Sequence, residues 1–333
     1  MPGIRLIRLG LTEAWKTQAV YHAVAGMMTE KSPDTVILCR PDTPYLCLGY
    51  HQVFDDVFDS DSCARLGLPV YRRKIGGGGT LLDSGQLFYQ CVFHRSRVPA
   101  ATDRLFAGML EAPVRVLRRL GLEAELNDIN EIRVDHKRIA GTGGGVIGDA
   151  VVVVGNILVS FQHDVLPQVW RAMGSARSRA IAGAALHAHL TTLRAQSLNI
   201  PYKELENLLI GEFSGSLGRP LVQGDLTLAE WTAALEARSE LTSAEFLHCH
   251  PAETSGAAMP RPLKIAAGVF LHVETVPAGG GMIHATLLVE DGVVTAASLE
   301  SESVRDLHSM AQKLHGMTID RWRIALELSL EAA

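Results

Sequence analysis

A glycine-rich stretch that runs directly into a valine-rich one sets the strongest limit on how this chain can fold. Residues 143–154 read GGGVIGDAVVVV, and Gly143, Gly145 and Gly148 satisfy the G-x-G-x-x-G spacing of dinucleotide-binding folds. That fingerprint requires a helix to follow it, whereas consecutive valines favour a strand. A doubly wound dinucleotide-binding domain is therefore excluded. The apolar segment 150–161 is also too short and too β-branched for a membrane span.

The order of the other segments predicts an α+β fold, with a mixed β-sheet flanked by helices. Apolar residues recur at helical spacing over 12–30 and 102–121, among short strand-like runs without regular βα alternation. A stretch rich in Gly, Pro and Ser precedes the last third of the chain. We therefore predict a first domain at 1–214, a linker at 215–225 and a small α+β C-terminal domain at 226–333.

Charge and cysteine usage narrow the class of function. The 333 residues carry a formal net charge of −5, so no overall basic field indicates nucleic acid as a partner. The five cysteines are widely spread without a C-x-x-C pair, which is typical of a reducing compartment and argues against a disulfide framework. The first residues lack the pattern of a signal peptide, so we expect a cytoplasmic protein without a membrane partner.

Two glycine tracts accompany clusters of cations. Gly76, Gly77, Gly78 and Gly79 follow Arg72, Arg73 and Lys74, and the tract at 143–145 follows Lys137 and Arg138. Without a Cβ, backbone N–H groups can approach an anion closely. No GxxxxGK[ST] motif is present, so a P-loop is excluded. The two tracts therefore predict an anionic, phosphate-bearing ligand held in another way.

Several motifs in order resemble the lipoate–protein ligases, which are relatives of biotin ligases and class II aminoacyl-tRNA synthetases. RRKIGGGGTLLDSGQLFY resembles that family's RRxSGGGxVxHDxGNLxY stretch, and NEIRVDHKRIAG resembles its NDIxVDGKKIAG. LGYHQ at 48–52 and VGNIL at 154–158 are similar to two further family segments. The residues after 268 look like the accessory domain of bacterial ligases. The resemblance implies a synthetase-like catalytic fold followed by that accessory domain.

The resemblance also implies a reaction and its site. Lipoate would attack ATP, with Mg²⁺ present, to give lipoyl-AMP, and a lysine of a lipoate-accepting protein domain would then take the lipoyl group. Arg138 and Lys137 are the catalytic candidates, and Glu131 is the candidate Mg²⁺ contact. Leu46, Leu48, Val70 and Phe88 could wall an apolar slot. The substrate-binding candidates are Gly49, Arg72, Arg73, Gly76, Gly77, Gly78, Gly79, Leu82, Asp83, Asn130, Glu131, Gly141 and Gly155.

The chain departs from the family pattern at the catalytic position. The family's lysine lies immediately before I-A-G, where this chain has Arg138. Lys137 is one residue away and would face the opposite side of a strand, unless a bulge intervenes. We therefore expect Arg138 to take over the electrostatic role. His136 occupies a turn position that is usually glycine, and Leu82 replaces a histidine.

Other functions give different expectations. An ATP-independent octanoyl or lipoyl transferase would need a reactive cysteine thiolate, and none lies between Cys91 and Cys249. A lipoate-binding protein without catalysis would have no use for a phosphate cradle. Biotin is a weaker candidate substrate, because the GRGRxGR-type loop of biotin ligases is absent. The HAH and HCH triplets lack a third ligand at metal-site spacing, so we expect ordinary histidines there.

Overall fold

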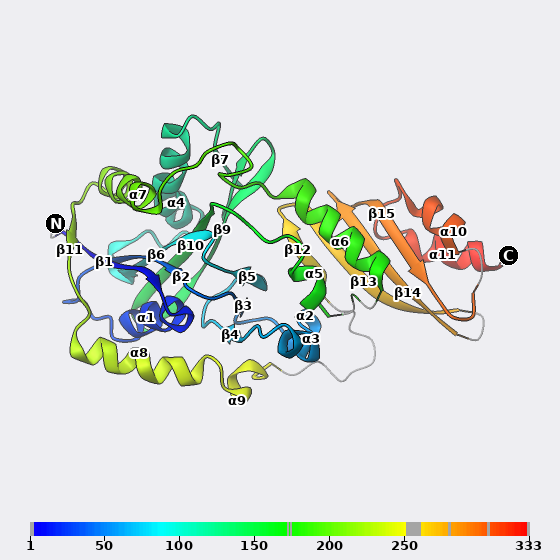
Figure 1. Cartoon of the computed structure of the whole chain (residues 1–333), viewed down its shortest axis with the longest axis horizontal. Coiled ribbons are helices and arrows are strands. Elements are labelled where there is room, and N and C mark those ends of the chain that lie inside the picture. The colour runs from blue at the N-terminus through cyan, green and yellow to red at the C-terminus, as the bar shows by residue number, and fades with distance from the viewer. Residues whose placement is uncertain are drawn as a thin grey trace. The chain divides into compact units, whose positions relative to one another are not determined.

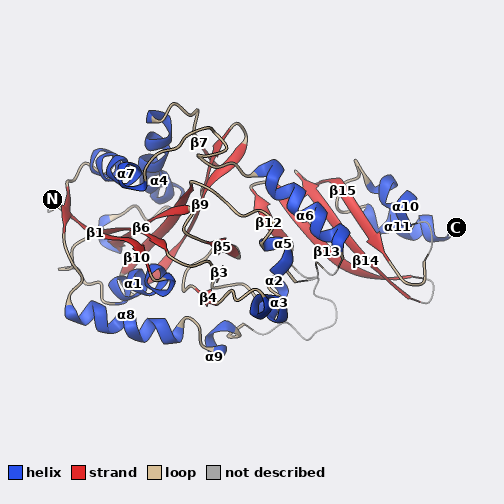
Figure 2. Cartoon of the chain, in the orientation of Figure 1, coloured by secondary structure: helices blue, strands red, loops and turns tan. Residues whose placement is uncertain are grey.

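The chain of the computed structural model forms two compact units. The structure describes residues 3–171, 173, 175–250, 261–278, 281–304 and 307–331. Unit 1 combines residues 1–54, 63–161 and 190–250, and unit 2 combines residues 55–62, 162–189 and 251–333. The chain therefore passes between the units several times. Figure 1 shows the elements coloured along the chain, and Figure 2 separates helices from strands.

An eight-stranded mixed sheet forms the centre of unit 1. Its order is β11-β1-β2-β6-β10-β9-β8-β7, with parallel pairing at β11-β1-β2 and antiparallel pairing elsewhere. The mixed pairing confirms the predicted α+β class. The strands are β1 (Ile4–Thr12), β2 (Thr35–Pro41), β6 (Gln86–His94), β7 (Glu125–Asn127), β8 (Glu131–Val134), β9 (Lys137–Ile147), β10 (Ala150–Leu158) and β11 (Leu221–Gln223).

Helices cover both faces of this sheet. One core cluster packs α4 and α7 on one face, and a second packs α1 and α8 on the other. A small three-stranded sheet, of order β4-β3-β5, joins the α1 side through Tyr45, Cys47 and Leu82. The elements are α1 (Ala14–Gly26), β3 (Tyr45–Leu48), β4 (Val70–Arg72), β5 (Thr80–Leu82), η1 (Arg95–Arg97), α4 (Thr102–Arg119), α7 (Tyr202–Ser216), α8 (Leu228–Glu240) and α9 (Ala244–Leu247).

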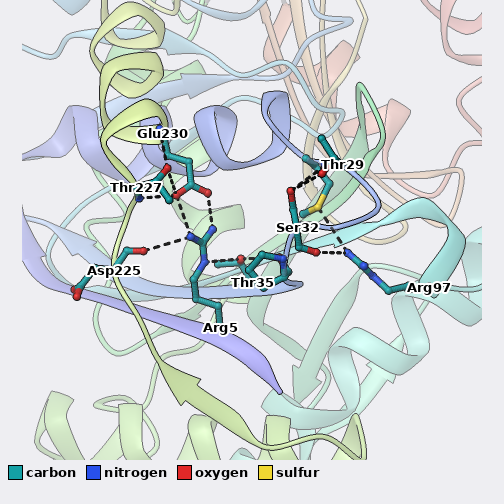
Figure 3. A network of polar contacts seen from close by, with 10 residues as sticks. Arg5, Thr29, Ser32, Thr35, Arg97, Asp225, Thr227 and Glu230 are labelled. Carbon is teal, nitrogen blue, oxygen red and sulfur yellow. Dashed lines mark hydrogen bonds and ion pairs between the residues drawn. The ribbon is translucent and has the colours of Figure 1, made fainter. Parts of the chain in front are cut away.

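Polar contacts fix α8 to the sheet. Arg5 on β1 donates to both carboxylate oxygens of Glu230 at 2.6 and 2.9 Å (Figure 3). Thr227 and Glu230 form a reciprocal capping box at the start of α8. Nearby, Arg97 donates to the carbonyl of Ser32 and forms an ion pair of 2.9 Å with the fully buried Asp34. The Arg5–Glu230 pair holds α8 against β1, and the Arg97–Asp34 pair ties the segment after β6 to the start of β2.

Unit 2 is a four-stranded antiparallel sheet with helices. The order is β12-β13-β14-β15, and the turn between β14 and β15 has positive φ at Asp291 and Gly292, as a tight hairpin requires. Helices α10 and α11 share a core cluster with every second residue of β14. Thr286, which lies between two of these β14 residues, forms a hydrogen bond with Ser178 on α6. The elements are α5 (Leu166–Val169), α6 (Ala176–His189), β12 (Leu263–Ala266), β13 (Val269–Ala278), β14 (Gly281–Glu290), β15 (Val293–Glu300), α10 (Leu307–Leu314) and α11 (Trp322–Glu331).

The division into units differs from the predicted boundary at 215–225. That stretch contains β11, which pairs with β1, and α8 packs on α1 in the same unit. Unit 2 also takes residues 55–62 and 162–189 from within the first predicted domain, and the short helices α2 (Phe54–Val57) and α3 (Ser60–Arg65) lie at these chain crossings. Local composition marked a loop at 215–225, but long-range strand pairing keeps it within unit 1. Among the residues described, no helix is long and apolar enough to cross a membrane.

Candidate functional site

The glycine run at 76–79 packs directly against the backbone of two other segments. Gly76 N donates to Gly144 O on β9 at 3.0 Å. A Cβ on Gly143 would lie 2.6 Å from Gly76 O, and a Cβ on Gly49 would lie 1.9 Å from Gly77 O. Both distances are shorter than any real Cβ contact. Gly49 and Gly143 are therefore required by the contact of their segments with the carbonyls of the run, whatever ligand binds there.

Arg73 holds the carbonyl groups of the run. Its Nε donates to Gly76 O at 3.2 Å and its Nη2 to Gly78 O at 2.9 Å, while Nη1 contacts Cys47 Sγ at 3.3 Å. The side chain is buried. Gly77 has φ +117°, and a Cβ there would lie 2.4 Å from Arg73 Nη2. The guanidinium is thus engaged with the loop itself, in contrast to the predicted direct role as a phosphate donor.

Three amide groups of the run have no acceptor. Within the part of the chain that the structure describes, the N–H groups of Gly77, Gly78 and Gly79 donate to no backbone or side-chain oxygen. Gly77 and Gly78 are exposed. Backbone amides that are left unpaired in a constrained, glycine-rich turn form an anion-binding concavity. These amides are therefore the candidates for the predicted cradle, and Arg73 binds the carbonyls of the same loop.

Arg72 is a buried structural cation. Its Nη1 donates to the carbonyls of Gly49, Tyr50 and Gln52 at 3.2, 2.8 and 2.7 Å. Its Nε and Nη2 both donate to Leu247 O. The residue is 0 % exposed, and burial lowers the pKa of its guanidinium. With these donors used by main-chain oxygens, Arg72 is not placed as the predicted ATP contact.

The hairpin of β8 and β9 carries the second cationic group. Asp135 and His136 form its turn with φ of 50° and 62°, so His136 adopts the left-handed conformation usually left to glycine. The register shifts between Ile132 and Arg133, which pair with Ala140 and Arg138. Ile139 is therefore an extra residue, and this β-bulge lies directly after Arg138.

The Arg138 guanidinium lies along its own strand. A Cβ on Gly141 would lie 1.8 Å from Arg138 Nη2, so only glycine leaves room for this side chain. Its Nε lies 4.0 Å from Glu131 Oε2, and the side chain keeps 28 % exposure. Burial lowers the pKa of Arg138, and the Glu131 carboxylate opposes that shift. An arginine so placed stays charged.

Glu131 does not fit the predicted contact with Mg²⁺. Its carboxylate is 2 % exposed, accepts from Arg133 Nε at 2.8 Å and faces Arg138. A carboxylate neutralised by two arginines stabilises those cations and has little capacity left for a hydrated metal. Among the described residues, no group of three or more His, Cys, Asp or Glu side chains could hold a metal ion. Asn130, the neighbouring candidate, donates from its Nδ2 to Thr142 O at 3.4 Å.

A chain of amide groups connects the hairpin to β6. Gly141 N donates to Asn156 Oδ1 at 3.0 Å, and Asn156 Nδ2 donates to Gln86 Oε1 at 2.6 Å. Gln86 Nε2 continues to Leu81 O at 3.1 Å and Asp83 Oδ1 at 3.4 Å. Sequence reasoning missed Asn156, although it lies within the motif VGNIL. Its signal was a polar residue in an otherwise apolar strand.

The remaining candidates have mainly packing roles. Leu82 and Asp83 are buried, and Asp83 accepts from Gly85 N at 2.9 Å. Gly155 accommodates the Tyr89 ring, because a Cβ there would lie 2.3 Å from Tyr89 Oη. The four residues named for the apolar slot differ in burial. Three of them, Leu46, Leu48 and Phe88, are buried in the core, and Val70 is half-buried.

The two main parts of the site meet on one face of β9. Side chains two residues apart on a strand share a face and lie about 7 Å apart. Gly141 accommodates the Arg138 guanidinium, and Gly143 accommodates the carbonyl of Gly76. The glycine run and the Arg138 guanidinium therefore pack against the same face of β9. This arrangement is the candidate site for an anionic small molecule, built on a mixed sheet.

Comparison with known proteins gives the family. Residues 13–214 match the model of the lipoyl protein ligase A/B catalytic domain, and the chain therefore belongs to this family. A lipoate-protein ligase A subunit 1 from Thermoplasma acidophilum is 29% identical over 210 residues, which cover 60% of this chain and 78% of that protein. An octanoyltransferase LipM from Kyrpidia tusciae is 24% identical over 268 residues, 73% of this chain and 97% of that protein.

Solved structures confirm the fold. A bi-partite lipoate protein ligase of Thermoplasma acidophilum, studied with its E2 lipoyl domain, has a TM-score of 0.69 at 23% identity, over 76% of this chain and 100% of that chain. A lipoate-protein ligase A bound with ATP has a TM-score of 0.63 at 25% identity, over 74% and 99%. The predicted resemblance and the mixed sheet with flanking helices are thus confirmed.

Proposed function

We propose that the protein is an ATP-dependent lipoate–protein ligase. The observation that carries this proposal is that the glycine run and the Arg138 guanidinium pack against the same face of β9, at Gly143 and Gly141. An acyl-adenylate reaction builds negative charge at a phosphate and at a carbonyl oxygen. Fixed donors that surround such a site stabilise that charge without reorganisation. The relative bound with ATP supports the choice of nucleotide.

In the first step, a carboxylate oxygen of lipoate attacks the α-phosphorus of ATP. A new P–O bond forms, the bond to the β-phosphate oxygen breaks, and pyrophosphate leaves. The amides of Gly77, Gly78 and Gly79 would bind the phosphate oxygens, while Arg73 keeps the loop rigid. Arg138 would offer its exposed N–H groups to the α-phosphate and the acyl oxygen. Lys137 is half-buried beside it and would contribute charge only.

In the second step, the amine of an acceptor lysine attacks the acyl carbon of lipoyl-AMP. The C–N bond forms, the C–O bond to phosphate breaks, AMP leaves, and the amine loses one proton. Arg138 would stabilise the oxyanion of the tetrahedral intermediate. The acceptor would be a lipoate-accepting domain, a proposal supported by the Thermoplasma ligase studied with its E2 lipoyl domain.

A direct test uses mass spectrometry. The protein is incubated with ATP, Mg²⁺ and lipoate, and lipoyl-AMP and pyrophosphate are measured before and after a lipoyl-domain acceptor is added. We expect the adenylate first and then a lipoyl mass gain on one acceptor lysine. Absence of adenylate in every condition, with properly folded protein, would refute the ligase proposal.

A transferase is the second candidate, because the Kyrpidia relative is named an octanoyltransferase. A thioester route needs a reactive thiol. Burial raises the pKa of Cys39 and Cys91, which disfavours their thiolates, and Cys47 and Cys63 are also buried. Cys249 is exposed but lies on the segment after α8. ATP-independent transfer from octanoyl acyl-carrier protein, lost in a Cys249→Ser variant, would support the transferase instead.

A further inference from the structure

A segment outside the family match completes unit 1 beside the candidate site. Residues 240–250, the 240–250 strap, comprise the end of α8, helix α9 and the turn after it. The family match ends at residue 214, well before this segment. Arg5 and Glu230 anchor the preceding helix to β1 (Figure 3). Helix α8, which leads into the strap, is therefore anchored near its start by this ion pair in the same unit.

The strap binds the cations that precede the glycine run. Arg72 N donates to Leu241 O at 2.9 Å, and the Arg72 guanidinium donates to Leu247 O. Lys74 Nζ forms an ion pair of 2.6 Å with Glu240, and it lies 5.9 Å from the ring centroid of Phe246. Two of the three cations are thus bound to this strap.

The same arginine also holds the loop at 49–52. Its Nη1 donates to three carbonyls of that loop, those of Gly49, Tyr50 and Gln52. The Tyr50 ring packs on Phe246 of the strap with ring centroids 6.3 Å apart. Gly49 in turn lies against the carbonyl of Gly77. A continuous path of contacts therefore runs from the strap through Arg72 and the 49–52 loop to the glycine run.

We infer that Arg72 and the 240–250 strap form a positioning device for the substrate loops, and this inference rests on the proposed ligase function. The guanidinium is fully buried and its charge is balanced by main-chain carbonyl dipoles. Only a planar group with five N–H donors can bridge two backbone segments in this way. Arg72 acts on the substrate through the 49–52 loop, without touching it.

Hydrogen exchange reports on the loop independently of activity. Tyr50 N donates to Ile75 O at 3.0 Å, Gln52 N to Gly49 O at 3.1 Å, and Gly49 N to the Gln52 side chain at 3.1 Å. In Phe246→Ala and Arg72→Lys we expect these three amides to exchange at least about tenfold faster, because local opening becomes easier. Exchange across β6 and β10 should stay at the wild-type rate.

Kinetics then separate a positioning role from a merely structural one. We expect the KM values for lipoate and ATP to rise about tenfold in Phe246→Ala, with kcat within about twofold, because the loops bind substrate less well. Glu236→Gln is the matched control. It lies one turn before Glu240 on α8 and forms no ion pair with any residue that the structure describes.

The outcomes are distinct. Wild-type exchange at residues 49–52 in folded Phe246→Ala would overturn the inference, as would faster exchange with unchanged KM values. If Arg72→Lys does not fold, Phe246→Ala alone decides. If exchange is faster in both variants but the wild-type protein makes no lipoyl-AMP, the link between the 240–250 strap and the 49–52 loop stands. The ligase proposal is then refuted.

Discussion

The two walls of the candidate site are built on different principles. The glycine wall is fixed from several directions, because Gly49, Gly77 and Gly143 have no space for a Cβ and Arg73 binds two carbonyls of the run. The hairpin wall depends on a single partly exposed side chain, Arg138, with a long ion pair of 4.0 Å to Glu131. The glycine wall requires positions without side chains, whereas the hairpin wall requires the guanidinium of one side chain. They should therefore fail differently when altered.

The largest effect is expected from Gly49→Ala. The added Cβ would lie 1.9 Å from Gly77 O, and backbone must shift to relieve it. We expect lipoyl-AMP formation to fall at least about 100-fold and the free energy of unfolding to drop by about 2–3 kcal/mol. Gly108→Ala is the matched control, because its Cβ would meet no atom within 4 Å and it lies on α4, outside the candidate site. Equal loss in both variants would contradict the packing explanation.

Substitution of Arg138 should remove activity without loss of stability. Arg138→Ala is expected to lower kcat for adenylate formation by about 100- to 1000-fold, the range for one preorganised donor at a developing charge. Arg138→Lys should recover part of the rate, and Lys137→Ala should stay near wild type. Pyrophosphate release and urea denaturation measure the two quantities. Loss of activity in Lys137→Ala but not in Arg138→Ala would show that Lys137, and not Arg138, has this role.

Glu131→Gln tests how the arginine is held. Removing the buried charge leaves Arg138 less well oriented, so we expect kcat to fall about tenfold, equivalent to about 1.4 kcal/mol. The Mg²⁺ concentration for half-maximal rate should not change, because Glu131 is engaged with Arg133 and Arg138. A large shift in that concentration would show that Glu131 binds the metal after all.

A milder effect should follow from pH at the glycine wall. His22 accepts from Lys74 N at 2.9 Å and its Nδ1 bonds to Gln18 O, and burial lowers its pKa from 6.5 to about 3. Below pH 6.5 the unfolded chain therefore binds a proton that the folded chain does not. We expect stability to fall as pH drops from 6.5 toward 3, by up to about 1.4 kcal/mol per pH unit.

Urea denaturation at pH 5 to 7 measures this slope. His22→Gln, which keeps a polar side chain without a titrating group, should flatten the profile over that range. A slope as steep in His22→Gln as in the wild type would assign the pH dependence to other groups.

Sequence reasoning predicted the fold class and the two motifs that converge, because glycine tracts and the hairpin are local patterns. It could not assign the arginines. Arg72 binds carbonyls 20 to 23 residues earlier and another 175 residues later, and no local spacing encodes such contacts. The sequence leaves open whether a bulge occurs at Ile139, because the register of a strand depends on its partner strand. The loop at 215–225 resembles a linker by composition, but its strand β11 pairs with β1.

That pairing has a consequence for synthesis on the ribosome. β1 emerges long before its partner β11, because Ile4 pairs with Leu221, 217 residues later in the chain, and the Glu230 partner of Arg5 comes later still. Unit 1 therefore cannot complete this edge until on the order of tens of seconds after β1 has been made. By then the α5 and α6 segments of unit 2 have already emerged, while their sheet is still unmade. Nascent chains should thus depend on chaperones over that interval.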